Sequence, residues 1–158
     1  MFHRWAALGI VLVLWAMTPK NAAGQGTTQS PRSPGAGAIG KPYPNPFNPE
    51  ITIPFSVDST CADAGLQHEV TLEVKNFLGQ TVAIPLLQSA SPFGNAAVSV
   101  SADGKTPIAK IHLGCGLYTG YWTGNILGTT QEAASGTYLV VLTVDGKVKP
   151  VTRIFNRK

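Results

Sequence analysis

Cysteine and histidine are the residues of this sequence best suited to metal or redox chemistry. Cys61, His68, His112 and Cys115 offer thiol and imidazole groups, the ligands that zinc prefers. His112 and Cys115 have a spacing that a zinc site tolerates, but Cys61 and His68 are seven residues apart, and a strand-borne His68 could point away. Two cysteines in an exported chain favour a disulfide instead. We therefore predict a Cys61–Cys115 disulfide, with free thiols and a zinc site as alternatives.

No spacing in the sequence matches a catalytic motif. There is no Gly-x-Ser-x-Gly, no His-Glu-x-x-His and no phosphate-binding loop. Asp58 and Asp63 could bind calcium, but two carboxylates without a third donor are more typical of solvated loop residues. We expect His68 on the surface, and Trp122 and Tyr138 in the core. The sequence thus predicts a protein that is not an enzyme and has no cofactor, metal site or small-molecule substrate.

The N-terminal segment has the pattern of an export signal. A short basic start precedes the uncharged run 5–17, and small residues follow it. Because this run is too short to span a membrane, residues 1–24 are predicted to be a cleaved signal peptide rather than an uncleaved anchor. Residues 25–40 are rich in Gly, Ser, Thr and Pro, which predicts a disordered linker. We expect the protein in the periplasm, at the cell surface or outside the cell, with only transient membrane contact.

The remaining residues, 41–158, are enough for one domain with its own core. Removal of the signal peptide takes away two of the twelve basic residues and leaves a net charge of +2. This small charge, without interleaved basic and aromatic residues, argues against nucleic-acid binding. The last twelve positions nevertheless hold five basic residues and no acidic one: Lys147, Lys149, Arg153, Arg157 and Lys158. Three of them, Arg153, Arg157 and Lys158, lie within six positions and are either a feature that a partner recognises or charges that protect an edge strand against aggregation.

Alternation of apolar and polar residues predicts an all-β domain. The clearest pattern is that of residues 69–75, where Val70, Leu72 and Val74 alternate with polar side chains. Turn-forming residues separate short segments of this kind, and helical periodicity is absent. The pattern is typical of an Ig-like antiparallel sandwich of seven to eight strands. The expected strands are 51–57, 69–75, 81–84, 97–100, 108–113, 117–122, 136–144 and 151–155.

Two of these strands have further features. Pro54 places strand 51–57 at a sheet edge, because proline cannot donate to a ladder. Residues 136–144 are apolar on both faces, as expected for a central strand that is covered on both sides. Asp145-Gly146 directly after it is a strong signal for a two-residue hairpin.

A proline-rich segment, residues 41–49, precedes the first of these strands. Its four prolines each fix their own φ and favour extended geometry in the residue before them, so the segment is predicted to be stiff. Phe47 is its one large apolar side chain besides Tyr43. We expect Phe47 to fill the end of the sandwich and Tyr138 to begin a central strand.

Four stretches of the chain form an ordered set of short motifs. They are Pro44-Asn-Pro-Phe-Asn-Pro49 with Ile51-Thr-Ile53, Phe77-Leu-Gly-Gln-Thr-Val82, Trp122-Thr-Gly124 with Ser135-Gly-Thr-Tyr138, and Arg153-Ile-Phe-Asn-Arg-Lys158. Together they resemble the bacterial Ig-like domain of the flagellar hook-capping type, which also serves as the type A C-terminal sorting domain of type IX secretion. The motif positions are Pro44, Asn45, Pro46, Phe47, Asn48, Pro49, Gly79, Trp122, Gly124, Gly136, Tyr138 and Lys158. The sequence departs from the family pattern in the longer segment 88–116, at Thr123 and at Asn156.

The resemblance implies a module that acts through protein contacts and not through chemistry. As a sorting domain it would be recognised by export machinery, and as a hook-cap-like module it would be a structural or adhesive partner of another surface protein. A carbohydrate-binding accessory domain is the third alternative, with Tyr118, Tyr121 and Trp122 as its platform. Strand alternation places Tyr121 on the opposite face from the other two rings, which counts against a flat sugar platform.

Overall fold

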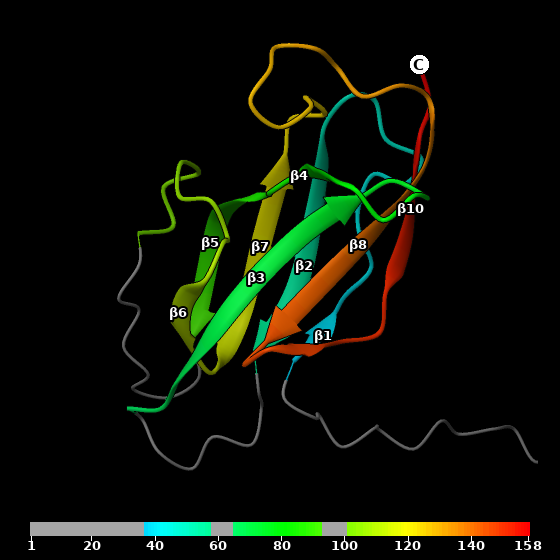
Figure 1. Cartoon of the computed structure of the whole chain (residues 1–158). Helices are drawn as coiled ribbons and strands as arrows, with labels where there is room; N and C mark the ends of the chain where they lie inside the picture. Colours follow the sequence, from blue (N-terminus) through cyan, green and yellow to red (C-terminus); the bar gives the residue numbers. More distant parts are fainter. Residues whose placement is uncertain (1–36, 58–64, 93–100) are drawn as a thin grey trace, which may run out of the picture. The chain divides into compact units, whose positions relative to one another are not determined.

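The computed structural model of the chain describes residues 37–57, 65–92 and 101–158. These residues form ten strands and no helix (Figure 1). The strands are β1 (Ala38–Ile39), β2 (Ile51–Val57), β3 (Gln67–Lys75), β4 (Thr81–Ala83), β5 (Leu86–Pro92), β6 (Ile111–Gly114), β7 (Gly116–Trp122), β8 (Gly136–Val144), β9 (Lys147–Val148) and β10 (Thr152–Asn156). The expected signal peptide 1–24 and the expected strand 97–100 lie outside the described residues.

The strands form two antiparallel sheets that pack as a sandwich. The four-stranded sheet has the order β1-β2-β7-β5. The six-stranded sheet has the order β10-β8-β3-β4, with β6 beside β3 and β9 beside β8. The predicted all-β antiparallel sandwich is confirmed. The described strands outnumber the predicted seven to eight because β1, β5 and β9 were not predicted.

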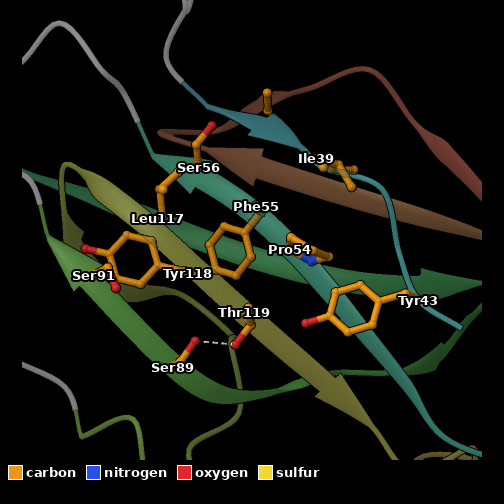
Figure 2. A pocket seen from close by; sticks show the side chains of 12 residues that line it. Ile39, Tyr43, Pro54, Phe55, Ser56, Ser89, Ser91, Leu117, Tyr118 and Thr119 are labelled. Carbon is orange, nitrogen blue, oxygen red and sulfur yellow. Dashed lines mark hydrogen bonds between the residues drawn. The ribbon is translucent and has the colours of Figure 1, made fainter.

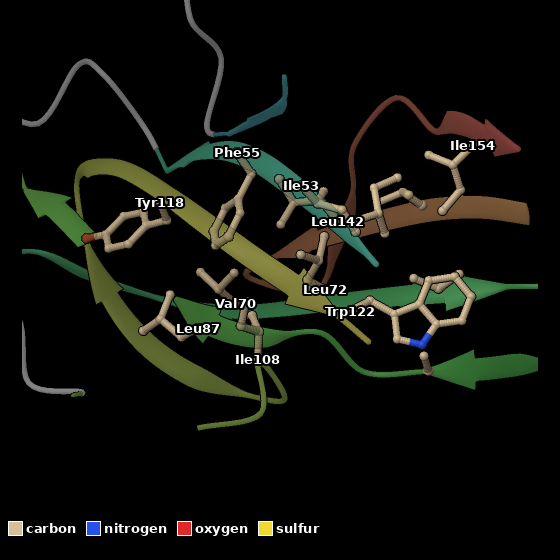
Figure 3. Close-up of a cluster of buried hydrophobic side chains, with 14 of the residues drawn as sticks. Ile53, Phe55, Val70, Leu72, Leu87, Ile108, Tyr118, Trp122, Leu142 and Ile154 are labelled. Atoms are coloured by element: carbon tan, nitrogen blue, oxygen red, sulfur yellow. The ribbon is translucent and has the colours of Figure 1, made fainter. Parts of the chain in front are cut away.

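The core lies between the two sheets and is built from every second residue of the long strands (Figure 3). The four-stranded sheet contributes Ile53, Phe55 and Tyr118, and the six-stranded sheet contributes Leu72 and Leu142, all of them buried. Burial of each such side chain stabilises the fold by about 1.5–3 kcal/mol. The alternation that predicted these strands therefore also predicted their buried faces.

Most predicted strands are confirmed, several with small shifts in their bounds. β2 and β8 have the predicted bounds, and β3, β7 and β10 differ from prediction by one or two residues. The Asp145-Gly146 hairpin is confirmed, since Val144 pairs with Lys147 across a two-residue turn. Both turn residues have the positive φ, 49° and 72°, that such turns require.

The predicted linker is wrong at its C-terminal end. Residues 38 and 39 pair with Ser56 and Phe55 as strand β1, and the N–H of Gly40 donates to the Pro54 carbonyl at 2.8 Å. The reason is Ile39, the one large apolar side chain of the expected linker, which packs against the core. β2 is consequently not a bare edge strand. Pro54 is tolerated in β2 because the N–H that it lacks would point towards β1 and not towards β7.

Three predictions about the later strands need correction. β5 was not predicted, because two prolines bound it and its Gln-Ser-Ala-Ser centre is a weak strand pattern; pairing with β7 orders it. β6 starts at Ile111 rather than at Ile108, because Lys110 has a positive φ of 51° that interrupts the strand. β8 is central, but its outer face is only partly covered, since Val141 is buried there while Leu139 and Thr143 are partly exposed.

Candidate functional site

The proline-rich segment bonds to the outer edge of β10, the last strand. The side-chain amide of Asn45 accepts a hydrogen bond from the N–H of Phe155 at 2.9 Å and donates to the carbonyl of Arg153 at 3.3 Å. The backbone of Phe47 continues this pairing: its N–H donates to the Phe155 carbonyl at 2.8 Å, and its carbonyl accepts from Arg157 at 3.0 Å. The first and last motifs of the chain therefore form one structural unit.

Asn45 and Phe47 alternate with prolines, and this alternation suits pairing with the outer edge of β10. Pro44, Pro46 and Pro49 have no N–H, and the residues that bond to β10 stand between them. The peptide bonds before these three prolines are cis. Asn48 is exposed and does not take part in the pairing.

Phe47 fills the end of the sandwich, as predicted. Its side chain is 1% exposed, and its ring centroid lies 5.3 Å from that of Trp122. Trp122 in turn contacts Tyr138 edge to face at 5.6 Å. Three of the predicted motif positions thus form one buried aromatic cluster that spans both sheets. Such ring pairs add about 0.5–1.5 kcal/mol each beyond their buried area.

Gly124 lets the proline-rich segment approach the end of β7. Its φ is +84°, and an added Cβ would lie 2.9 Å from the Cβ of Pro49 and even closer to the Pro49 carbonyl oxygen. The Trp122 indole N–H donates to the carbonyl of Asn125 at 2.8 Å, which fixes the same turn. The Trp-x-Gly motif therefore fits the proline motif closely.

Tyr138 is the third residue of the central strand β8, which begins at Gly136 and not at Tyr138 itself, and its hydroxyl is anchored. The hydroxyl donates to the carbonyl of Ala134 at 2.7 Å, and burial raises the pKa of the phenol above its ordinary value. Gly136, the first residue of β8, pairs with Asn156. Gly79 closes the β3–β4 turn by donating to the Asn76 carbonyl at 3.0 Å. These motif positions have structural roles.

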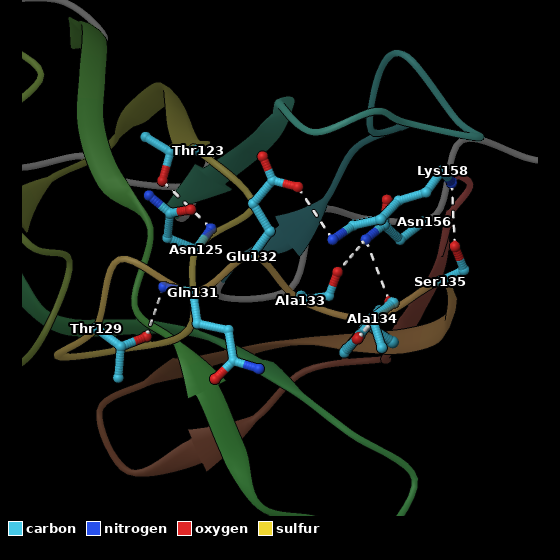
Figure 4. A network of polar contacts seen from close by, with 11 residues as sticks. Thr123, Asn125, Thr129, Gln131, Glu132, Ala133, Ala134, Ser135, Asn156 and Lys158 are labelled. Carbon is cyan, nitrogen blue, oxygen red and sulfur yellow. Dashed lines mark hydrogen bonds and ion pairs between the residues drawn. The ribbon is translucent and has the colours of Figure 1, made fainter.

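Asn156, one of the departures from the family pattern, points inward and holds the loop before β8 (Figure 4). Its side-chain amide donates to the carbonyls of Ala133 at 2.9 Å and Ala134 at 3.2 Å. The two carbonyls satisfy the NH2 group of this buried amide, which offsets part of the cost of a polar residue at an inward position of β10. The Asn156 Oδ1 is buried without a hydrogen-bond partner among the described residues.

The basic residues at the end of the chain divide into two kinds. The Lys158 ammonium lies 3.0 Å from the Glu132 carboxylate, and its backbone N–H donates to Ser135 (Figure 4). Arg153 and Arg157 are exposed, and neither forms an ion pair with a described residue. The two arginines are therefore presented to solvent from a strand that is fixed along both edges.

His68 is buried, which corrects the expectation of a surface residue. Only 8% of it is exposed, because it lies on the inward side of β3 opposite Leu113. Its Nδ1 donates to the Asp145 carboxylate at 2.6 Å, and its Nε2 lies 3.9 Å from Cys115 Sγ. The Asp-Gly hairpin thus brings a carboxylate to a histidine 77 positions away in the sequence, a contact that no local pattern indicated.

The hydrogen bond from His68 lowers the pKa of the Asp145 carboxyl below its ordinary value of 3.8, against the opposing effect of burial. The Glu69 N–H and the charge of Lys149 act in the same direction as His68. A carboxyl with a lowered pKa in the folded state stabilises the protein above the pKa of the unfolded state, and this stabilisation disappears as the pH falls through the folded pKa.

We therefore expect Asp145→Asn to reduce the free energy of unfolding at pH 7, with a difference from wild type that shrinks below about pH 4. Urea unfolding between pH 2 and pH 7 measures this difference. Asp103→Asn, which removes an exposed loop carboxylate, is the matched control. A difference between wild type and Asp145→Asn that stays constant down to pH 2 would contradict the role of the charge.

The zinc alternative is not assembled by the described residues. His68 and His112 point to opposite faces of the six-stranded sheet, since His112 pairs with Glu69 on the outer side. No group of three metal-binding side chains occurs in the part of the chain that the structure describes. Asp58, Asp63 and Cys61 lie outside the described residues, so the disulfide between Cys61 and the buried Cys115 stays a prediction.

A groove crosses the outer face of the four-stranded sheet (Figure 2). It has a volume of about 420 Å³. Two cross-strand rows form its floor, with Tyr43 and β1 at its side: Pro54, Thr119 and Ser89 in one row, and Ser56, Leu117 and Ser91 in the other. The platform considered from the sequence does not form here, because Tyr118 and Trp122 are buried in the core and Tyr121 is on the outer face.

The chain matches no family model, no curated protein and no solved structure. Within the described residues there is no helix long and apolar enough to cross a membrane.

Proposed function

We propose that residues 38–158 form a non-catalytic sorting module of an exported protein, which type IX secretion machinery recognises in its folded form. The observation that carries this proposal is the attachment of the proline-rich segment to β10. Asn45 and Phe47 fix the last strand from one side while β8 pairs with it from the other. Three of the four motifs that gave the resemblance are therefore joined, because the proline motif contacts the last motif through Asn45 and Phe47 and the Trp-x-Gly motif through Phe47 and Pro49.

Recognition then proceeds through side chains rather than through strand addition. Both edges of β10 are occupied around Phe155, so a partner cannot pair with that part of the strand. Arg153, Phe155 and Arg157 alternate outward and are exposed, whereas Ile154 and Asn156 are buried. An exposed aromatic ring between two arginines is the kind of group that protein interfaces favour.

The test is delivery of a fluorescent protein that carries a signal peptide at its N-terminus and residues 25–158 at its C-terminus, in a host with working type IX secretion. Deletion of β10 would remove the buried Ile154 and Asn156 and unfold the domain, so exposed charges are changed instead. The double variant Arg153→Gln/Arg157→Gln should stay in the periplasm at an unchanged melting temperature, while the parent fusion reaches the surface.

The matched control is Lys105→Gln/Lys147→Gln, which removes the same charge from two exposed positions outside β10. It should reach the surface like the parent fusion. Retention of the parent fusion in the periplasm would reject the sorting function in that host. Surface delivery of the arginine variant would show that these side chains are not the recognised feature.

An adhesive contact module is the second candidate, and the β3–β4 hairpin favours it. Phe77 is 69% exposed and Leu78 is 84% exposed at its tip. The Asn76 side chain accepts hydrogen bonds from the N–H groups of Leu78 and Gln80, both at 3.0 Å, which fixes the turn. Two large apolar groups on a fixed turn are suited to insertion into a pocket of another protein.

A further inference from the structure

Within the residues that the structure describes, the four-stranded sheet carries no charged side chain. None of the residues of β1, β2, β5 and β7 is Asp, Glu, Lys, Arg or His, and the same holds for every residue that lines the groove. The six-stranded sheet, in contrast, contains basic, acidic and histidine side chains on four of its strands. A charged ligand would lose hydration in the groove without gaining a counter-charge, so the groove is suited to an uncharged ligand.

Hydroxyl groups line this uncharged groove. Ser56, Ser89, Ser91 and Thr119 all point outward from three adjacent strands, and the hydroxyls of Ser89 and Thr119 are hydrogen-bonded to each other (Figure 2). Each hydroxyl can both donate and accept. A ligand that itself bears several hydroxyls matches this lining, because each of its groups can take either role.

An aromatic ring stands at the side of the groove. Tyr43 is 56% exposed, yet its backbone is fixed: its N–H donates to the Thr52 carbonyl at 2.9 Å, and its carbonyl accepts from the Thr52 N–H at 2.8 Å. The exposed side chain of Leu117 adds apolar surface on the floor. A fixed ring beside hydroxyl groups suits a ligand with one apolar face and a polar rim.

We propose that this groove binds an uncharged saccharide, with the ring of Tyr43 against the C–H face of a sugar and the hydroxyls of Ser56, Ser91 and Thr119 bonded to its rim. The volume of about 420 Å³ lies in the range of small-ligand sites and holds one or a few sugar units. The site does not depend on the sorting function, since it lies on the other sheet from β10.

Affinity electrophoresis of the full chain tests the proposal. The protein is run in native gels that contain a soluble β-glucan, an α-glucan, a galactomannan or, as the charged comparison, polygalacturonate. We expect at least one neutral polysaccharide to retard the protein and polygalacturonate not to do so. Lack of retardation in all three neutral gels, or retardation by polygalacturonate alone, overturns the proposal.

Matched variants locate the site. Tyr43→Ala and Thr119→Val should each weaken binding at least fivefold. Their controls are Phe77→Ala, which removes an exposed ring at the β3–β4 tip, and Thr137→Val, which removes a half-buried hydroxyl from the six-stranded sheet. The controls should bind like wild type. Thermal unfolding shows whether each variant is folded, and a folded Tyr43→Ala that binds like wild type overturns the assignment to this groove.

Other occupants would give different results. If a second copy of the chain covers the groove, sedimentation will show a dimer that Tyr43→Ala dissociates, and the saccharide proposal is then rejected. Titration with a soluble oligosaccharide from the retarding polymer, followed by tyrosine fluorescence, should saturate for wild type and for Phe77→Ala. A titration without saturation for wild type also rejects it.

Discussion

Phe47→Ala should lower the free energy of unfolding by about 3–5 kcal/mol, the usual cost of removing a buried phenylalanine side chain. The ring is 1% exposed and packs on Trp122 at 5.3 Å, so its loss leaves a cavity at the end of the core. The cavity also weakens the support for the backbone bonds from Phe47 to Phe155 and Arg157. Urea unfolding at pH 7 measures the change, and the melting temperature should fall by roughly 10–20 °C.

Phe77→Ala is the matched control for this prediction. It removes the same side chain from a position that is 69% exposed, so it should change the stability by less than about 0.5 kcal/mol. Equal effects of the two substitutions would mean that the proline-rich segment is not attached to the domain in solution. If Phe47→Ala had the same free energy of unfolding as wild type, the proline-rich segment would likewise not be attached to the domain in solution.

The sequence allowed the long strands to be predicted because each buries one face only. In β3, Val70, Leu72 and Val74 are fully buried, and the polar residues between them are not. A period of two is a property of the strand itself and requires no knowledge of its partners. The attachment of Phe47 was predictable for a related reason, since a large apolar side chain in a stiff polar segment needs a buried place.

The strands that depend on partners could not be predicted. β5 has the weak central sequence Gln-Ser-Ala-Ser and is ordered by its pairing with β7. β1 has two residues, and only the packing of Ile39 on the core and the pairing with β2 define it. Such tertiary contacts outweigh local preference, and single-sequence patterns do not contain them.

The candidate sites also combine residues that the sequence indicated with tertiary contacts that it could not indicate. Asn45 was part of a recognised motif, but its bonds to Arg153 and Phe155 connect positions more than 100 residues apart. The groove was missed because its lining comes from weak strand residues such as Ser89 and Ser91. The absence of charge from all four strands was visible in the sequence, although it acquires meaning only when those strands are known to share one sheet.

The second large effect is expected for Gly124→Ala, which should cost about 2–4 kcal/mol. The added Cβ would overlap the Pro49 carbonyl oxygen and would lie 2.9 Å from the Pro49 Cβ. Overpacking of this kind typically costs 1–3 kcal/mol, and the positive φ of +84° adds roughly 1 kcal/mol of strain for any residue with a side chain. Relief of the overlap requires the proline-rich segment to move away from β7, which also weakens the contact between Phe47 and Trp122.

Gly128→Ala separates the overlap from the strain. Gly128 lies in the same loop with a φ of +74°, and no described atom lies within 4 Å of its added Cβ, so it should cost only about 1 kcal/mol. The difference between the two variants, measured by urea unfolding, is then the contribution of the close approach between Gly124 and Pro49. If the two variants lost the same free energy of unfolding, backbone strain would account for the whole effect of Gly124→Ala. That result would contradict the close fit of the Trp-x-Gly and proline motifs.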